Sequence, residues 1–131
     1  MYMLDTNICI YIIKKRPKTV LEQLRKKKKK GLFISSITLA ELEFGVENSE
    51  YKRENRIALM EFLVIMGIKN FDDNAAKIYG IIKKDLKNKS CIIGPMDMLI
   101  GAHAKSQNMI LVTNNTKEFT RINGLKVEDW A

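Results

Sequence analysis

The chain has 131 residues, 46% of them hydrophobic and 29% charged, which predicts a single globular domain over residues 1–131 rather than a disordered chain. Lysine and arginine outnumber aspartate and glutamate by 23 to 15, and the net charge of +8 favours a polyanionic partner, usually nucleic acid. No apolar run reaches the roughly 18 residues of a membrane span, and the N-terminus lacks the basic start of a signal peptide. The two cysteines have no metal-binding spacing and are expected to be buried, reduced thiols. We therefore expect a cytoplasmic protein that does not bind a membrane.

The first predicted strand, Tyr2 to Leu4, runs directly into an acid, Asp5. A helix over about Asn7 to Lys15 should follow, with Thr6 or Asn7 as its N-cap. An acid at the carboxyl end of the first strand of an α/β sheet lies where such sheets bind their ligands. Taken alone, Asp5 fits a simple helix cap as well as it fits a functional carboxylate.

A second predicted helix starts at Pro17, which suits a first helical turn. It ends in an uninterrupted basic run, Arg25 to Lys30, before Gly31. Two interpretations of this run stay open. It is either an RNA-facing patch or a solvated helix end that the helix dipole favours.

The next strand is predicted over Leu32 to Ile37, and a helix follows at once. Thr38 and Glu41 match the capping box Thr-x-x-Glu, so capping is the structural explanation for Glu41. A longer helical pattern covers about Glu54 to Met66, with apolar residues at three- and four-residue spacing.

The second half of the chain continues the alternation of strands and helices. A helix that is apolar almost all round is predicted from Pro95 to about Ser106, and such a helix is usually buried. The other expected elements are a short strand at Ile68 to Phe71, a helix over about Asn74 to Leu86 capped by Asp72 or Asp73, a strand at Met109 to Thr113, a helical turn at Glu118 to Arg121 and an edge strand at Leu125 to Val127. This alternation predicts an α/β fold with a central, mostly parallel sheet and helices on both faces.

Four acids follow predicted strands or open predicted helices: Asp5, Glu41, Asp97 and Glu118. The carboxyl ends of parallel strands share one edge of a sheet, so these acids should lie close together. Clustered carboxylates repel each other, and a hard divalent cation such as Mg²⁺ or Mn²⁺ relieves that repulsion through oxygen ligands. A metal with a polyanionic partner indicates phosphoryl chemistry. Each acid singly also fits a helix N-terminal charge, worth roughly 0.3–1 kcal/mol.

The sequence has no P-loop, no dinucleotide-binding glycine motif, no zinc-protease motif and no nucleophile elbow. Its only histidine, His103, follows Asp97 by six residues, which turns it well away from that acid on a helix. We expect His103 to be packed or hydrogen-bonded and water activated by the metal to be the nucleophile. Four polar residues fit the positioning of water or phosphate as well as ordinary capping and turns: Thr6, Asn7, Thr113 and Asn114.

Five segments resemble the motifs of PIN-domain ribonucleases, and specifically of the VapC toxins of bacterial type II toxin–antitoxin pairs. They are Met3 to Asn7, Ile34 to Leu42, Ile93 to Asp97, Leu111 to Phe119 and Val127 to Trp130. Each motif alone is loose, but the motifs occur in the family's order along the whole chain. The resemblance implies a PIN-like domain.

The resemblance also assigns roles to residues. It implies that Asp5, Glu41 and Asp97 form the core catalytic and metal-binding triad. Glu118 joins the catalytic and metal-binding residues at a fourth acidic position, where many relatives carry aspartate. Its longer side chain is expected to bind the metal through water or only to contact the metal's ligands. Thr6 matches a hydroxyl beside the metal, and Asn115 falls where some PIN domains place a further acid.

The family implies a Mg²⁺- or Mn²⁺-dependent endoribonuclease that cleaves structured RNA, often a tRNA anticodon loop, and inhibits translation. Hydrolysis by metal-activated water should leave a 5′-phosphate and a 3′-hydroxyl. Basic residues that fit RNA contacts, besides the lysine run, are Lys14, Lys15, Arg16, Lys83, Lys84 and Lys117.

The family further implies a VapB-type antitoxin, a toxin homodimer and a toxin–antitoxin hetero-oligomer. Apolar residues such as Ile12, Ile13 and those of Leu59 to Val64 fit an antitoxin groove, and they fit the core equally.

Two other functions compete with this one. The first is an RNA-binding PIN-like module without turnover, against which the intact acids count. The second is another Mg²⁺-dependent α/β phosphoryl-transfer enzyme, such as a phosphatase or a receiver domain. That reading needs a lysine directly after a late strand, whereas Lys117 follows only after a turn.

Overall fold

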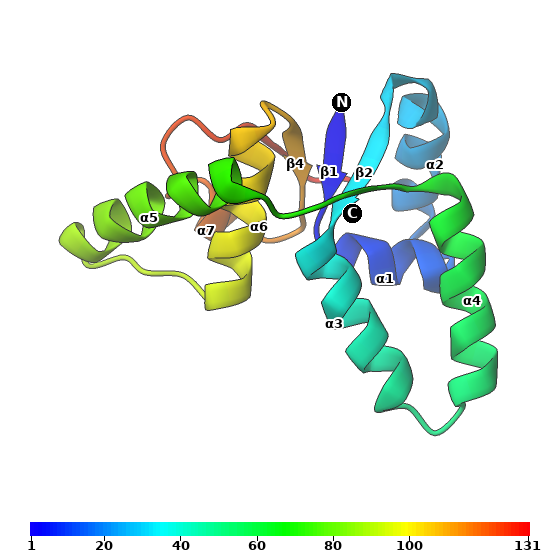
Figure 1. Ribbon diagram of the computed structural model, residues 1–131. Helices are drawn as coiled ribbons and strands as arrows, with labels where there is room; N and C mark the ends of the chain where they lie inside the picture. The colour runs from blue at the N-terminus through cyan, green and yellow to red at the C-terminus, as the bar shows by residue number, and fades with distance from the viewer.

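The computed structural model describes residues 1–131 and has a five-stranded sheet at its centre (Figure 1). The strand order is β3-β2-β1-β4-β5, and every neighbouring pair is parallel. The strands are β1 (Tyr2–Leu4), β2 (Leu32–Ser35), β3 (Gly67–Lys69), β4 (Ile110–Val112) and β5 (Val127–Glu128). The predicted α/β fold is confirmed, with a sheet that is entirely rather than mostly parallel.

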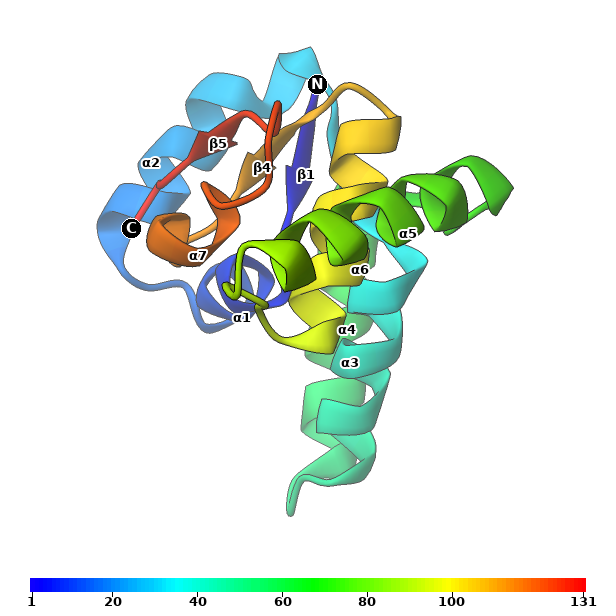
Figure 2. The ribbon, with the colours of Figure 1, turned by 90° about the vertical axis from the view of Figure 1, so that its left-hand side faces the viewer.

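Helices cover both faces of the sheet (Figures 1 and 2). They are α1 (Thr6–Lys14), α2 (Lys18–Lys27), α3 (Ser36–Glu47), α4 (Lys52–Ile65), α5 (Asp73–Asn88), α6 (Pro95–Ser106) and α7 (Thr116–Phe119), with a 3₁₀ turn, η1 (Lys28–Lys30), after α2. Helices α3 and α4 form a hairpin that projects beyond the sheet (Figure 1). No helix is both long enough and apolar enough to cross a membrane.

The sheet separates two apolar cores because successive side chains of a strand point to opposite faces. Tyr2 and Leu4 of β1 belong to the core that α1 to α4 cover, whereas Met3 belongs to the core under α5, α6 and α7. All three are buried, which explains why the central strand is a continuous apolar run rather than an alternating one. The buried helix α6 is confirmed, with six consecutive or near-consecutive buried residues between Met98 and Ala104.

Two predicted helix starts are wrong. Asp5 itself is the N-cap of α1, because its Oδ1 accepts a hydrogen bond from the Ile8 amide at 3.0 Å. Strand β2 ends at Ser35, whose hydroxyl accepts a bond from the Ile37 amide at 3.1 Å, so α3 begins two residues before Thr38. The capping box is therefore wrong, and with it the capping explanation for Glu41.

The remaining boundaries differ by one to three residues. Pro17 is the N-cap of α2 instead of a member of its first turn, and α4 starts at Lys52 rather than Glu54. Asp72 caps α5 as predicted, through a 2.9 Å bond from the Ala75 amide. Both cysteines are free, but only Cys9 is buried, since Cys91 is half-buried.

Candidate active site at the carboxyl edge of the sheet

The carboxyl edge of the sheet carries the four acids that the sequence singles out. Asp5 follows β1 directly, and Glu41 lies in the second turn of α3, which follows β2. Asp97 lies in the first turn of α6, and Glu118 lies in α7, which follows β4. Because all five strands are parallel, these helix starts meet at one edge (Figure 2).

Asp5 is the buried member of the group, with only 4% of its surface exposed. The pKa of its carboxyl is raised from 3.8 to about 6. Burial is the largest cause; hydrogen bonds from the Thr113 side chain and the Ile8 amide oppose it, and the charges of Asp97 and Glu41 add to it. The raised pKa means that the ionised form of this carboxyl is destabilised in the folded protein, and a nearby cation would stabilise it.

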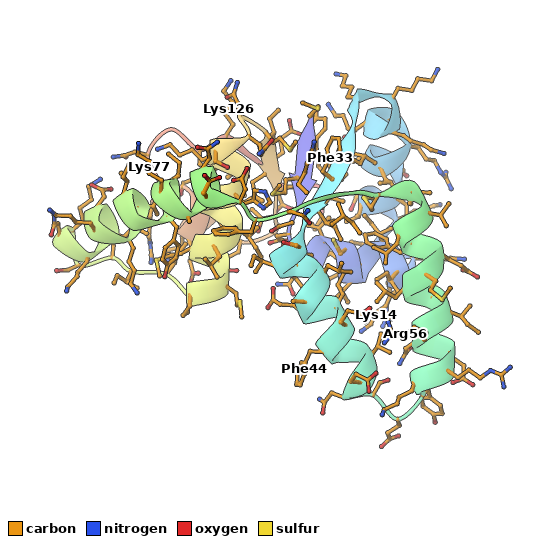
Figure 3. The ribbon with its side chains drawn as sticks, viewed as in Figure 1. Lys14, Phe33, Phe44, Arg56, Lys77 and Lys126 are labelled. Carbon is orange, nitrogen blue, oxygen red and sulfur yellow. The ribbon has the colours of Figure 1, made fainter.

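Glu41 is held beside Asp5 through the next residue of the chain. The Thr6 hydroxyl donates to Glu41 Oε1 at 2.6 Å and lies 3.4 Å from the hydroxyl of Thr38. Glu41 also lines a hollow of about 270 Å³ between α1, α3 and α4. Lys14, labelled in Figure 3, lines the same hollow and brings a positive charge near this acid.

Asp97 and Glu118 complete the edge. The pKa of Asp97 is raised, first by burial and then by the charges of Glu118 and Glu41. Glu118 Oε2 accepts a hydrogen bond from the Asn115 side-chain amide at 2.9 Å. The charges of both Glu41 and Glu118 therefore act on Asp97. The structure brings the four predicted acids together at one edge of the sheet.

The donors fit a hard divalent cation, because all four are carboxylates and two of them, Asp5 and Asp97, carry raised pKa values. The side chains do not form a ready cage: no group of three or more acid, histidine or cysteine side chains converges closely enough to hold a metal ion. Glu41 and Glu118 instead accept hydrogen bonds from Thr6 and Asn115. Each glutamate uses one carboxylate oxygen in that bond, which leaves its second oxygen available to a cation.

Two threonines, Thr38 and Thr113, support the acids in ways that the sequence analysis did not predict. Thr38, expected as a helix cap, is fully buried behind Thr6. Its spacing of three residues from Glu41 on one helix was the available signal for a shared face. Thr113 is also fully buried, and its hydroxyl accepts a bond from the Asn115 amide at 2.9 Å.

The other predicted polar residues, His103, Asn7 and Asn114, lie in different environments. His103 is fully buried, and its Nδ1 lies 2.8 Å from the Ser35 hydroxyl, which confirms a hydrogen-bonded core histidine. Burial lowers the pKa of His103. Asn7 is exposed, and the Asn114 amide donates to the Tyr11 hydroxyl at 2.8 Å.

The apolar residues considered for an antitoxin groove include both core and surface. Ile12, Leu59 and Phe62 are core residues, whereas Met60 is 60% and Val64 84% exposed. A hollow of about 390 Å³ lies between α1, α2 and α4. Its lining is mainly apolar: Ile12, Ile13, Leu21, Ala58, Phe62 and Ile65, with Lys15, Arg25 and Glu61.

Comparison with known proteins identifies relatives along the full chain. The PIN domain family model matches residues 2–125. The chain is 41% identical over 130 residues to the tRNA(fMet)-specific endonuclease VapC of Shigella flexneri, covering 99% of this chain and 98% of that one. It is 45% identical to Ribonuclease VapC2 of Rickettsia felis, covering 98% and 97% of the two chains.

A solved structure shares the fold closely. The crystal structure of VapBC2 from Rickettsia felis, bound to a DNA fragment from its promoter, superposes with a TM-score of 0.95. Sequence identity in that comparison is 43%, and the match covers 99% of this chain and 98% of the other.

Proposed function

Because the chain belongs to the PIN-domain family, in its VapC branch, we propose that it is a divalent-metal-dependent endoribonuclease and the toxin of a toxin–antitoxin pair. The observation that carries this proposal is the buried Asp5 carboxyl, whose pKa is raised to about 6 beside Asp97 and Glu41. A fold without a use for this cluster would gain stability by losing it. Relatives over nearly the full chain are named ribonucleases or tRNA(fMet)-specific endonucleases, which supports RNA as the substrate.

In this proposal, Asp5, Glu41 and Asp97 hold Mg²⁺ or Mn²⁺, and Glu118 binds it directly or through water. When bound, such an ion lowers the pKa of water and stabilises the charge that develops on the phosphodiester. Asp5 is the fixed ligand, because its Oδ1 is tied to the Ile8 amide and its burial excludes water from the other side.

Thr6 and Asn115 orient the two longer acids. The Thr6 hydroxyl holds Glu41 Oε1, and the Asn115 amide holds Glu118 Oε2, so each glutamate presents one defined oxygen. Partners of this kind restrict a ligand's rotation and typically change metal affinity by about 10–100-fold. Lys14 lines the same hollow as Glu41, and we expect it to pair with an RNA phosphate beside the acids.

The proposed substrate is a structured RNA, with a tRNA anticodon loop as the leading case, and cleavage would stop translation in the cytoplasm. The proposed partner is a VapB-type antitoxin, which would place an apolar segment in the hollow between α1, α2 and α4. Its lining of six apolar side chains fits such a segment. Solved relatives are VapBC complexes, which supports a hetero-oligomer with the antitoxin. A toxin homodimer is a further part of this proposal.

The decisive experiment incubates the purified chain with bulk bacterial tRNA and Mg²⁺ and sequences the new 5′ ends. We expect cleavage within one loop, products with 5′-phosphate and 3′-hydroxyl ends, and loss of cleavage in Asp97→Asn. The matched control is Asp85→Asn, on α5, where the carboxylate is partly exposed and pairs only with Lys89. RNA binding without cleavage would replace the enzyme with a binding module, and a 2′,3′-cyclic phosphate product would rule out hydrolysis by an activated water.

A further inference from the structure

The basic run Arg25 to Lys30 lies at the opposite edge of the sheet from the acids. It occupies the end of α2 and the turn η1, and Gly31 then leads into the first residue of β2. The Tyr2 amide donates to the Gly31 carbonyl at 2.9 Å, which places the run beside the chain's N-terminus. This is the amino edge of the parallel sheet, at the top of Figure 1.

Lys126 lies at the same edge, as Figure 3 shows. It precedes β5, which pairs with β4, and β4 pairs with β1. The turn η1 and Lys126 are thus separated by three strand spacings, or about 14 Å. The chain's amino terminus lies between them, so a row of positive groups runs along this edge from β2 to β5.

Most of these lysines have no structural task. None of the ion pairs in the structure involves the run or Lys126. Two members do have a contact, since Lys27 lies over the Tyr2 ring at 5.5 Å and Arg25 lines the hollow between α1, α2 and α4. The five that remain are all exposed, and we call them the amino-edge patch: Lys26, Lys28, Lys29, Lys30 and Lys126.

The amino-edge patch is too far from the acids to act on the phosphate that is cleaved. Between Lys30 and the end of β2 at Ser35, five residues of extended chain cover about 17 Å. A short piece of RNA seated on the acids therefore cannot touch the patch, whereas a folded RNA with a second arm can reach around the sheet.

The chemistry of the patch favours nucleic acid over a membrane. Residues 25–30 include no apolar side chain, and the apolar face of α2 is turned inward, with Val20 buried and Leu24 packed on the core. A helix that binds a bilayer needs an apolar face to insert, and this one has none to offer. Flexible lysines bind phosphates as point charges and do not read bases.

We propose that the amino-edge patch is a second RNA-binding surface, which holds the phosphate backbone of a structured RNA whose loop is cleaved at the opposite edge. This inference rests on the proposed function for its choice of RNA. It explains why the net charge of +8 is not concentrated around the acids. It also predicts that the protein prefers folded RNA to the isolated loop.

The test measures binding in EDTA, so that it does not depend on cleavage. Fluorescence anisotropy follows bulk bacterial tRNA, and separately a loop oligonucleotide too short to span the sheet, over a series of salt concentrations. The variant replaces Lys26, Lys28, Lys29 and Lys30 by glutamine, which keeps helix propensity. We expect the slope of log affinity against log salt to fall by about 2–4 for tRNA and to stay unchanged for the loop.

A matched control replaces four other exposed lysines by glutamine, none of which is a candidate RNA contact: Lys52, Lys77, Lys87 and Lys89. Both variants lose the same charge, so a slope that falls equally in both would overturn the proposal in favour of net charge alone. Binding of the same variants to phosphatidylglycerol vesicles is measured in parallel. An unchanged tRNA slope would also overturn the proposal, even if vesicle binding is lost. If no form of the protein cleaves RNA, the proposed function fails, yet these slopes still decide whether the patch binds RNA.

Discussion

At the scale of single residues, Asp5 is the N-cap of helix α1 through Oδ1, and it also lies buried beside Asp97 and Glu41. The cap is favourable, but the buried charge is not. The pKa in the folded chain, about 6, exceeds the ordinary value of 3.8, so the folded state binds a proton more tightly than the unfolded state. Stability from this group is complete below about pH 4 and is lost as the pH rises through 6, up to about 3 kcal/mol.

Asp5→Asn should therefore raise the free energy of unfolding at neutral pH by about 1–3 kcal/mol in EDTA, since asparagine keeps the cap without the charge. The gain should vanish below about pH 4. Urea unfolding over a pH series measures it, and Mg²⁺ should stabilise the natural protein but not the variant. An asparagine variant that is no more stable at neutral pH would show that the Asp5 charge is already compensated.

Thr6 offers a second residue-scale prediction, because its hydroxyl is a close partner of Glu41. Thr6→Val keeps the shape of the side chain and removes the donor, so Mn²⁺ affinity should fall by about 10–100-fold. Thr6→Ser is the matched control and should restore affinity. Mn²⁺ titration followed by electron paramagnetic resonance gives the affinities directly. Equal affinity in all three proteins would mean that Glu41 reaches the metal without this bond.

The four acids could be predicted because each one follows a strand or opens a helix, and a parallel sheet gathers those positions at one edge. Their partners could not be predicted as easily. Asn115 holds Glu118 across one short helical turn, and Thr38 backs Thr6 from a different helix. Such contacts depend on side-chain direction and on distances between elements, which a single sequence does not contain.

At the scale of elements, the order and type of strands and helices followed from apolar periodicity, but several starts did not. Ser35 shows the reason. Its hydroxyl caps α3 and also lies 2.8 Å from His103 Nδ1 on α6, so the packing of a distant helix favours this start over Thr38. Local capping patterns compete with each other, and tertiary contacts decide between them.

Helix α4 shows a related limit, since periodicity marks apolar faces without saying what covers them. Ile65 lines the hollow between α1, α2 and α4 and is 42% exposed, whereas Ile57 lies outside both large hollows of this helix and is 49% exposed. Ile65 and Ile57 thus have similar exposure, but only Ile65 lines the hollow between α1, α2 and α4. They therefore form a matched pair for testing where the proposed antitoxin binds.

Ile65→Glu should weaken binding of the antitoxin at least tenfold, because a charge would be buried against an apolar segment. Ile57→Glu should leave that affinity within about twofold. Both positions are exposed, so the unfolding free energy should change by less than about 1 kcal/mol in either variant. Isothermal titration with the purified antitoxin measures both. If the Ile57 variant is the weaker binder, the antitoxin uses the outer face of α4 instead of the hollow.

At the scale of the whole molecule, charge is divided between the two edges of one sheet. The carboxyl edge gathers four acids, and the amino edge carries the lysine run and Lys126 without any ion pair. Composition predicts a polyanionic partner, but it does not place the charges. The position of the lysine run follows from the chain entering β2 directly after it, which becomes informative only once the sheet is known to be parallel.

This division makes RNA binding depend on whether the acids are neutralised. In EDTA the acidic edge should repel the phosphates that the rest of the molecule attracts. Ca²⁺ is a hard cation that takes oxygen ligands, so it should neutralise the acids and raise the affinity for RNA. This effect does not depend on whether Ca²⁺ supports cleavage. The double variant Asp5→Asn/Asp97→Asn should bind RNA in EDTA as tightly as the natural protein binds it with Ca²⁺.

Anisotropy with bulk tRNA, at one salt concentration, compares the four conditions. We expect Ca²⁺ to strengthen binding by the natural protein about tenfold and to leave the double variant unchanged, since two like charges near a phosphate cost on the order of 1–2 kcal/mol at a partly exposed site. Weaker binding by the double variant in EDTA would mean that the carboxylates themselves accept hydrogen bonds from the RNA. If the double variant binds RNA more strongly and does not cleave it, RNA binding and cleavage place opposite demands on the carboxyl edge. The negative charge that hinders RNA binding is then the charge that recruits the metal.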